Sequence, residues 1–134
     1  MTKALMNKPQ WIKIIALSGA LSVALGAFAA HGLQDSLSET YLQTFRTAVL
    51  YQFLHTIALL ALVSLPDSAL NPRHQAWAAK SFLLGILLFS GSLYALVFTG
   101  ISALGMITPL GGLAFIFGWM LLFTAAQTTD KKLD

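Results

Sequence analysis

The chain has 134 residues, of which 57% are hydrophobic and only 10% are charged, and its mean hydropathy is +0.74. Soluble domains carry about 25% charged residues, so this chain lacks the polar side chains that would cover a globule in water. The absence of cysteine excludes disulfides, thiolate metal sites and thiol nucleophiles. The net charge of +3 does not indicate a nucleic-acid partner, because the basic residues lie at the ends of apolar runs rather than in one cluster. We therefore expect an integral membrane protein.

Four apolar runs are each long enough to cross a bilayer as a helix, which takes about 20 mostly apolar residues. Backbone polar groups in lipid must be satisfied within the segment, so helices are the expected form. The predicted spans are residues 11–30, 48–65, 76–98 and 108–126. The sequence predicts an all-α integral membrane protein, a four-transmembrane-helix bundle that forms a single membrane domain over residues 1–134.

The first run has a second interpretation, because basic residues precede it and Ala27-Phe28-Ala29 resembles the cleavage site of a signal peptide. The run exceeds the apolar core of a usual signal peptide, which favours a span. Small residues recur within the spans, where they let neighbouring helices approach closely. The predicted packing residues are Ser18, Ser22, Gly26 and Ala30 in the first span, Gly85 in the third, and Gly111 and Gly118 in the fourth.

The segment between the first two spans is less apolar and carries helix signals. Ser36-Leu37-Ser38-Glu39 fits a capping box, and Leu37, Tyr41 and Phe45 follow one another at intervals of four, which places them on one helical face. We expect either a short amphipathic helix on the outer surface or a long extension of the second span. Thr108-Pro109 is expected to begin the fourth helix as its N-cap and first helical residue.

The basic residues predict the orientation, since cytoplasmic flanks of spans are enriched in lysine and arginine. With four spans, seven basic residues share one side and Arg46 alone lies on the other. The seven are Lys3, Lys8, Lys13, Arg73, Lys80, Lys131 and Lys132. Trp11 and Trp77 fall at the same predicted interface, where aromatic rings anchor spans. The sequence therefore predicts that both termini lie in the cytoplasm.

Ionisable and amide side chains are costly inside spans and are therefore functional candidates. The predicted polar cluster lies in the outer half of the bundle and comprises His31, Tyr51, Gln52, His55, Ser90, Ser92, Tyr94 and Thr108. A hydrogen-bond network that only joins the helices is the simpler explanation, because no carboxylate accompanies the histidines at that depth.

No metal, cofactor or catalytic residue is predicted. His31 and His55 with Asp35 or Glu39 would supply three metal ligands, but the sequence has no paired-histidine spacing. Haem held by both histidines is disfavoured because they are predicted at different depths.

Four sequence blocks resemble those of a known family. They are GAFAAHG (26–32), TAVLYQFLH (47–55), FSGSLY (89–94) and ITPLGG (107–112). They are similar to the signature blocks of domain-of-unknown-function family 423 (DUF423), the YgdD/YwdK-type small four-span membrane proteins, related to a small eukaryotic transmembrane protein. Ala29 stands where the family pattern leads us to expect glycine. The resemblance implies a four-span plasma-membrane protein and implies no activity.

Three functions remain open at this stage. The leading hypothesis is a non-enzymatic membrane protein that binds a membrane lipid or a membrane-protein partner through the polar cluster. The alternative is an oligomeric transporter or channel for a small solute or protons, in which His31 and His55 line the pathway. The third hypothesis is a small membrane enzyme acting on a lipophilic substrate, and its only support is the analogy with other compact four-span proteins. A homo-oligomer is compatible with each of these functions.

Overall fold

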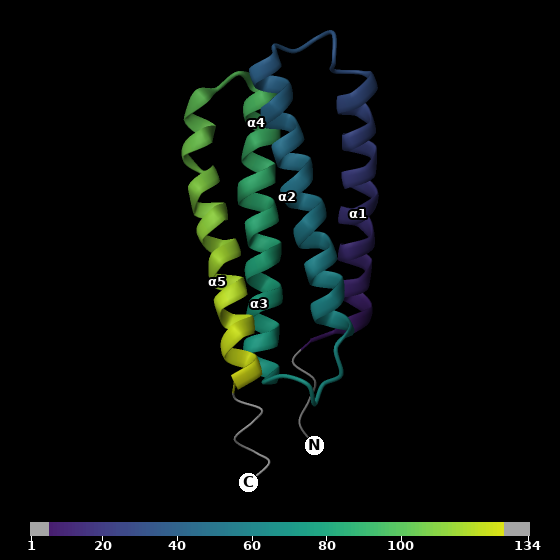
Figure 1. The fold of residues 1–134 in the computed structure, drawn as a ribbon, viewed down its shortest axis with the longest axis vertical. Coiled ribbons are helices and arrows are strands. Elements are labelled where there is room, and N and C mark those ends of the chain that lie inside the picture. The colour runs from purple at the N-terminus through teal and green to yellow at the C-terminus, as the bar shows by residue number, and fades with distance from the viewer. Residues whose placement is uncertain (1–5, 128–134) are drawn as a thin grey trace.

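The protein is a bundle of four long helical rods that lie side by side, as the computed structural model of residues 6–127 shows (Figure 1). Four helical segments are long and apolar enough to cross a membrane, which confirms the predicted all-α membrane bundle. The elements are α1 (Lys8–His31), α2 (Glu39–Ser64), α3 (Pro72–Gly85), a π-helical turn η1 (Ile86–Ser90), α4 (Gly91–Thr99), a 3-10 helix η2 (Ser102–Met106) and α5 (Thr108–Gln127). The described range contains no strand.

The rods pack in chain order. α1 lies against α2, α2 lies against the rod made of α3, η1 and α4, and α5 packs on the other side of that rod. α1 and α5 therefore lie on opposite flanks, and the described chain enters and leaves the bundle at the same end (Figure 1). We call this the terminal end of the bundle and the other the distal end.

α2 begins nine residues earlier than the predicted second span. Its N-cap is Ser38, whose hydroxyl accepts a hydrogen bond from the Tyr41 N–H (3.2 Å), so the capping box expected from Ser36 was placed two residues too early. Phe45 is fully buried, which makes the first turns of α2 part of the bundle. Of the two expected arrangements, the extension of the second span is the one found. Hydropathy detected only the apolar part of this helix.

α5 begins at Thr108 rather than just after it. The carbonyl of Ile107 accepts hydrogen bonds from the N–H groups of Leu110 and Gly111, so Ile107 occupies the position expected for Thr108. The Thr108 hydroxyl lies 2.6 Å from the hydroxyl of Ser92. This threonine therefore joins two helices instead of capping one.

The small-residue ladder of α1 follows a different line from the predicted one. Ser22 is buried, Ser18 and Gly26 are half-buried, and Ala30 is exposed, whereas Ala29 is only 2% exposed. Steps of four residues advance around a helix by about 40° each, so Ala30 lies about 120° from Ser18 while Ala29 lies only about 20° from it. The helix therefore buries Ala29 against α2, and Ala30 leaves the interface.

The predicted small residues of α3 and α5 lie where these helices meet. Gly111 and Gly118 are buried, and a Cβ on Gly118 would come within 2.7 Å of the Phe82 ring. A Cβ on Gly85 would overlap the ring of Phe115. At Gly111 the contact is with backbone, because a Cβ there would lie 2.7 Å from the Cα of Phe89 in the π-helical turn.

Candidate functional site

The buried amide of Gln52 connects three rods. Its Nε2 donates to the carbonyl oxygen of Ser18 in α1 (3.2 Å) and to the hydroxyl oxygen of the same residue (3.3 Å). Its Oε1 accepts a hydrogen bond from the Tyr94 hydroxyl in α4 (2.6 Å). Both ends of the amide are thus satisfied within the protein, and Gln52 is only 5% exposed.

Thr56 and Ser18 complete this arrangement. Thr56 donates its hydroxyl proton to the carbonyl of Gln52 (2.6 Å). In the 2.8 Å hydrogen bond between the hydroxyls of Thr56 and Ser18, Ser18 is therefore the donor and Thr56 the acceptor. Ser18 thereby accepts from Gln52 and donates to Thr56. Sequence reasoning had placed Ser18 only in the packing ladder and had missed Thr56, although four residues separate Thr56 from Gln52 and so bring both to one helical face.

His55 forms a second connection, between α2 and α5. The indole N–H of Trp119 donates to its Nε2 (3.2 Å), and its Nδ1 lies 2.9 Å from the carbonyl oxygen of Tyr51. An indole N–H only donates and a carbonyl only accepts, so the proton of the ring sits on Nδ1 and Nε2 is the acceptor. The imidazole stacks on Phe115 with ring centroids 3.6 Å apart.

Trp119 was missed in the sequence, yet a signal for it was present. It lies in the middle of the fourth span, away from the interfaces where tryptophan is enriched, and an indole N–H within the apolar part of a membrane needs a hydrogen-bond acceptor. His55 is that acceptor, and it is only 7% exposed. A mid-span tryptophan and a mid-span histidine could have been paired on these grounds.

The serines of the third rod join the remaining helices. Ser90 donates to the carbonyl oxygen of Ala48 in α2 (2.7 Å). Ser92 donates to the carbonyl oxygen of Phe89 (3.0 Å), so in the hydrogen bond between the hydroxyls of Ser92 and Thr108 the threonine is the donor. Each of these hydroxyls therefore has a partner inside the bundle.

The predicted cluster is not one site. Gln52 and Tyr94 belong to one set of contacts, and His55 belongs to another. Gln52 lies halfway along α2 and His55 lies beyond it, so both lie deeper than the predicted outer half, because α2 starts at Glu39. His31 is exposed at the distal end of α1 and is not brought near the others by any hydrogen bond.

Tyr51 contributes its carbonyl to His55 and stacks its ring on Phe89, with centroids 4.4 Å apart. Within residues 6–127, every buried side-chain nitrogen or oxygen has a hydrogen-bond partner. The same range holds no group of three histidine or acidic side chains placed to bind a metal ion. The arrangement therefore holds the helices together and leaves no buried side-chain nitrogen or oxygen of the described range without a hydrogen-bond partner.

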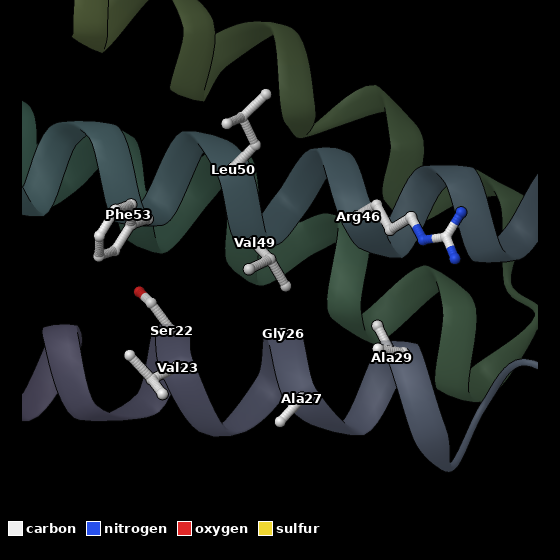
Figure 2. A pocket seen from close by; sticks show the side chains of 10 residues that line it. Ser22, Val23, Gly26, Ala27, Ala29, Arg46, Val49, Leu50 and Phe53 are labelled. Atoms are coloured by element: carbon white, nitrogen blue, oxygen red, sulfur yellow. The ribbon is translucent and has the colours of Figure 1, made fainter.

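A groove of about 390 Å³ opens between α1 and α2, beside this network (Figure 2). Small residues of α1 form one wall and larger apolar residues of α2 form the other. The lining residues are Ser22, Val23, Gly26, Ala27, Ala29, Ala30, Arg46, Val49, Leu50 and Phe53. Arg46 lies at one end, and Ser22 and Phe53 lie at the other (Figure 2).

Arg46 is the charged residue of this groove. Its side chain is exposed, and no described side chain forms an ion pair or hydrogen bond with its guanidinium. Ser22, at the far end, directs its hydroxyl to the carbonyl of Ser18 (2.8 Å). The groove is therefore apolar along its length and cationic at its distal end.

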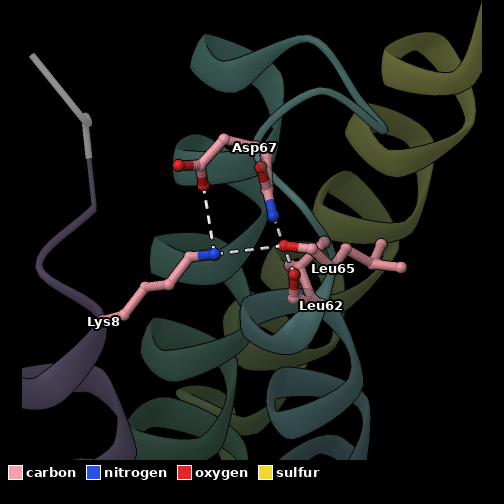
Figure 3. A network of polar contacts seen from close by, with 5 residues as sticks. Lys8, Leu62, Leu65 and Asp67 are labelled. Carbon is pink, nitrogen blue, oxygen red and sulfur yellow. Dashed lines mark hydrogen bonds and ion pairs between the residues drawn. The ribbon is translucent and has the colours of Figure 1, made fainter.

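At the terminal end, Lys8 fastens α1 to the loop that follows α2 (Figure 3). Its Nζ lies 3.1 Å from a carboxylate oxygen of Asp67 and donates to the carbonyl oxygen of Leu65 (3.2 Å). Gln75 of α3 donates to the carbonyl oxygen of Leu62 (2.8 Å) in the same region. These contacts close the bundle on the side of the termini.

Comparison with known proteins finds similar chains over most of this length. A family model described as "Protein of unknown function (DUF423)" matches residues 25–112. The UPF0382 membrane protein YwdK of Bacillus subtilis is 44% identical over 83% of this chain and 90% of its own. A UPF0382 membrane protein of Haemophilus influenzae is 47% identical over 86% of this chain and 91% of its own. The UPF0382 inner membrane protein YgdD of Escherichia coli is 35% identical over 87% of this chain and 88% of its own.

No solved structure matches this chain. The family model covers more than half of the sequence, and its matched range includes all four blocks that carry the resemblance. This four-span membrane protein therefore belongs to the DUF423 family.

Proposed function

We propose that the protein is a non-enzymatic membrane protein that binds a membrane phospholipid, with one acyl chain in the groove between α1 and α2 and the phosphate at Arg46. The observation that carries the proposal is an open apolar groove that ends at an arginine without a protein partner among the described residues. The polar cluster is not the binding site in this proposal, because its hydrogen bonds are made within the bundle.

The size of the groove supports an acyl chain. Its α1 wall runs from Ser22 to Ala30, which corresponds to about 12 Å at 1.5 Å per residue. One leaflet of the hydrocarbon core is about 15 Å thick, so a chain that starts at Arg46 would follow the groove through most of one leaflet. The volume of about 390 Å³ falls within the range of small-molecule sites.

The charge supports a phosphate at the distal end. Arg46 is the one basic residue that the lysine and arginine count assigns to the side away from the termini. A guanidinium donates two parallel hydrogen bonds to phosphate oxygens, which an ammonium cannot do in the same geometry. The exposed guanidinium at the end of the apolar groove is therefore placed to bind such an anion.

The transport and enzyme alternatives find less support. A pathway lined by His31 and His55 would need both side chains along one route, but His31 is exposed at the end of α1 and His55 is enclosed by Phe115 and Trp119. An enzyme acting on a lipophilic substrate would need polar side chains that converge on the reacting atoms, whereas the hydrogen bonds of the buried Gln52, His55 and Ser90 join helices to one another.

We also propose that the protein resides in the plasma membrane with its termini in the cytoplasm. The printed name of the E. coli relative places that protein in the inner membrane. Lys8, Lys13, Arg73 and Lys80 lie towards the terminal end, and the other three basic residues of the count, Lys3, Lys131 and Lys132, lie outside the described residues. An excess of basic residues on one side favours the cytoplasm for that side.

The lipid proposal is tested by native mass spectrometry of the full chain released from nanodiscs that contain phosphatidylglycerol. Gly26→Leu should retain one phospholipid fewer than the wild type, because the added side chain occupies the groove. Gly26→Ala is the matched control, since a Cβ there lies 3.5 Å from a methyl group of Val49, an ordinary contact. Ala20→Leu adds similar bulk on an exposed part of α1 that does not line the groove.

Arg46→Gln should keep the groove open and weaken retention of the phosphate-bearing lipid. Equal retention by Gly26→Leu and the wild type would overturn the groove as the site. Loss of a dimer in place of loss of lipid in Gly26→Leu would instead assign the groove to a second copy of the chain.

A further inference from the structure

Three exposed side chains of α3 form a row on one face of the helix, separate from the groove between α1 and α2. Arg73, Trp77 and Lys80 follow at spacings of four and three, which are the spacings of neighbours on a helix surface. Residues between them face inward, since Gln75 bonds to Leu62 and Ala78 is fully buried. The row therefore points away from the bundle.

The same face continues as an apolar surface. Leu84 and Leu87 extend the alternating spacing beyond Lys80, and they are 50% and 61% exposed. In a helix that spans a membrane, such side chains contact acyl chains. The change from arginine, tryptophan and lysine to leucine therefore marks where this face passes from headgroups into hydrocarbon.

Lys80 turns back towards the terminal end. Its Nζ lies 4.9 Å from the centroid of the Trp77 ring, and Trp77 precedes it by three residues. Lysines near the ends of spans extend along the helix in this way to bring the ammonium to the interface. Lys80 thus brings its ammonium to the indole ring, which is 53% exposed, and Arg73 lies about one turn beyond that ring towards the terminal end.

These cations have no acidic partner in the described part of the chain. α3 contains no acidic residue, and Asp67 of the preceding loop pairs with Lys8. His74 faces the bundle, where its Nδ1 lies 3.1 Å from the Thr124 hydroxyl. The charge of Arg73 and Lys80 is therefore left for a ligand from outside the described protein.

We propose that Arg73, Trp77 and Lys80 bind the headgroup of an anionic phospholipid in the leaflet at the terminal end, with its acyl chains along Leu84 and Leu87. Arg73 and Lys80 contact the phosphate, and the indole lies against the glycerol region. Two cations around one phosphate leave an excess of positive charge, so a headgroup with net negative charge binds better than a zwitterionic one.

The test is native mass spectrometry of the full chain titrated with phosphatidylglycerol or phosphatidylcholine of matched acyl chains. Arg73→Gln and Lys80→Gln should each weaken binding of phosphatidylglycerol about fivefold, as expected for one basic residue at an anionic membrane surface, and the preference over phosphatidylcholine should fall with it. Lys13→Gln is the matched control, because Lys13 is an exposed lysine of α1 towards the same end that is not part of the row. All three sites are exposed, and circular dichroism checks that each variant keeps its helices.

Equal losses from Lys13→Gln and Lys80→Gln would overturn the site, since they would show a general effect of charge. Equal affinity for the two lipids would overturn the headgroup preference. Displacement of the lipid by inorganic phosphate at constant ionic strength would assign the row to free phosphate rather than to a lipid. Arg46→Gln should weaken retention of both lipids alike and leave the preference for phosphatidylglycerol unchanged, so failure of the groove and failure of the α3 row remain distinguishable.

Discussion

At the scale of single residues, Gln52 explains why an amide persists in an apolar span. Its two ends reach Ser18 and Tyr94, so one side chain holds α2 to two other rods. That an amide in this position needs partners follows from the cost of an unpaired polar group in lipid. The cost of an unpaired polar group does not tell which residues the partners are, because Tyr94 is 42 residues away from Gln52 in the chain.

Gln52→Leu should destabilise the bundle by about 1–2 kcal/mol. The change removes two connections between helices, each worth about 0.6 kcal/mol on average in membrane proteins, and leaves the Tyr94 hydroxyl without its acceptor. Unfolding in sodium dodecyl sulfate, followed by circular dichroism, measures the difference. Gln43→Leu is the control, because Gln43 is exposed on the same helix, and equal stability of the two variants would contradict the role given to Gln52.

At the scale of elements, the close approach of α5 to the π-helical turn decides how the last two rods meet. Gly111 lies against the backbone of Phe89, where no side chain can turn aside to make room. The neighbouring Gly112 has room for a Cβ, since the nearest atom to it would be a ring carbon of Phe89 at 4.0 Å, an ordinary contact. The two adjacent glycines therefore have different requirements.

Gly111→Ala and Gly112→Ala should differ sharply in stability. Overpacking at Gly111 should cost about 1–3 kcal/mol, because Phe89 or the whole of α5 must shift. Gly112→Ala should be neutral or stabilising by up to about 1 kcal/mol, because alanine favours the helix. Thermal unfolding in detergent compares the two, and a Gly111→Ala protein as stable as the wild type would contradict the contact.

The elements also show what a hydropathy pattern detects. It located four spans, but the polar first turns of α2 lay outside the apolar run, and their burial depends on contacts such as that of Phe45 with Tyr94 (5.1 Å between ring centroids). The π-helical turn at Ile86–Ser90 carried no signal in composition. Such features depend on neighbouring rods, which a single segment does not encode.

At the scale of the whole molecule, the four rods bring both ends of the described chain to one end of the bundle (Figure 1). In the proposed orientation that end faces the cytoplasm, and the groove with Arg46 opens towards the other leaflet. The two proposed lipid sites thus belong to opposite leaflets.

The orientation predicts the labelling of single cysteines in cells. The chain has no cysteine, so all maleimide labelling of a variant comes from the introduced cysteine. Asp35→Cys, in the exposed distal loop, should react with a membrane-impermeant maleimide added outside, and Ser68→Cys, in the exposed loop after α2, should react only after the membrane is opened. The reverse pattern would place the termini outside.

The sequence alone established that the protein is a membrane protein with four spans, and it predicted the orientation. These properties follow from the composition, the lengths of the apolar runs and the positions of the lysines, because the insertion of a segment into a bilayer depends on the summed properties of its local sequence. The tertiary structure decided which polar residues meet. It separated His31 from His55, paired His55 with Trp119, replaced Ala30 by Ala29 at the α1 interface, and formed the groove at Arg46. Each of these depends on the rotation and height of one helix against another, and packing between distant segments sets both.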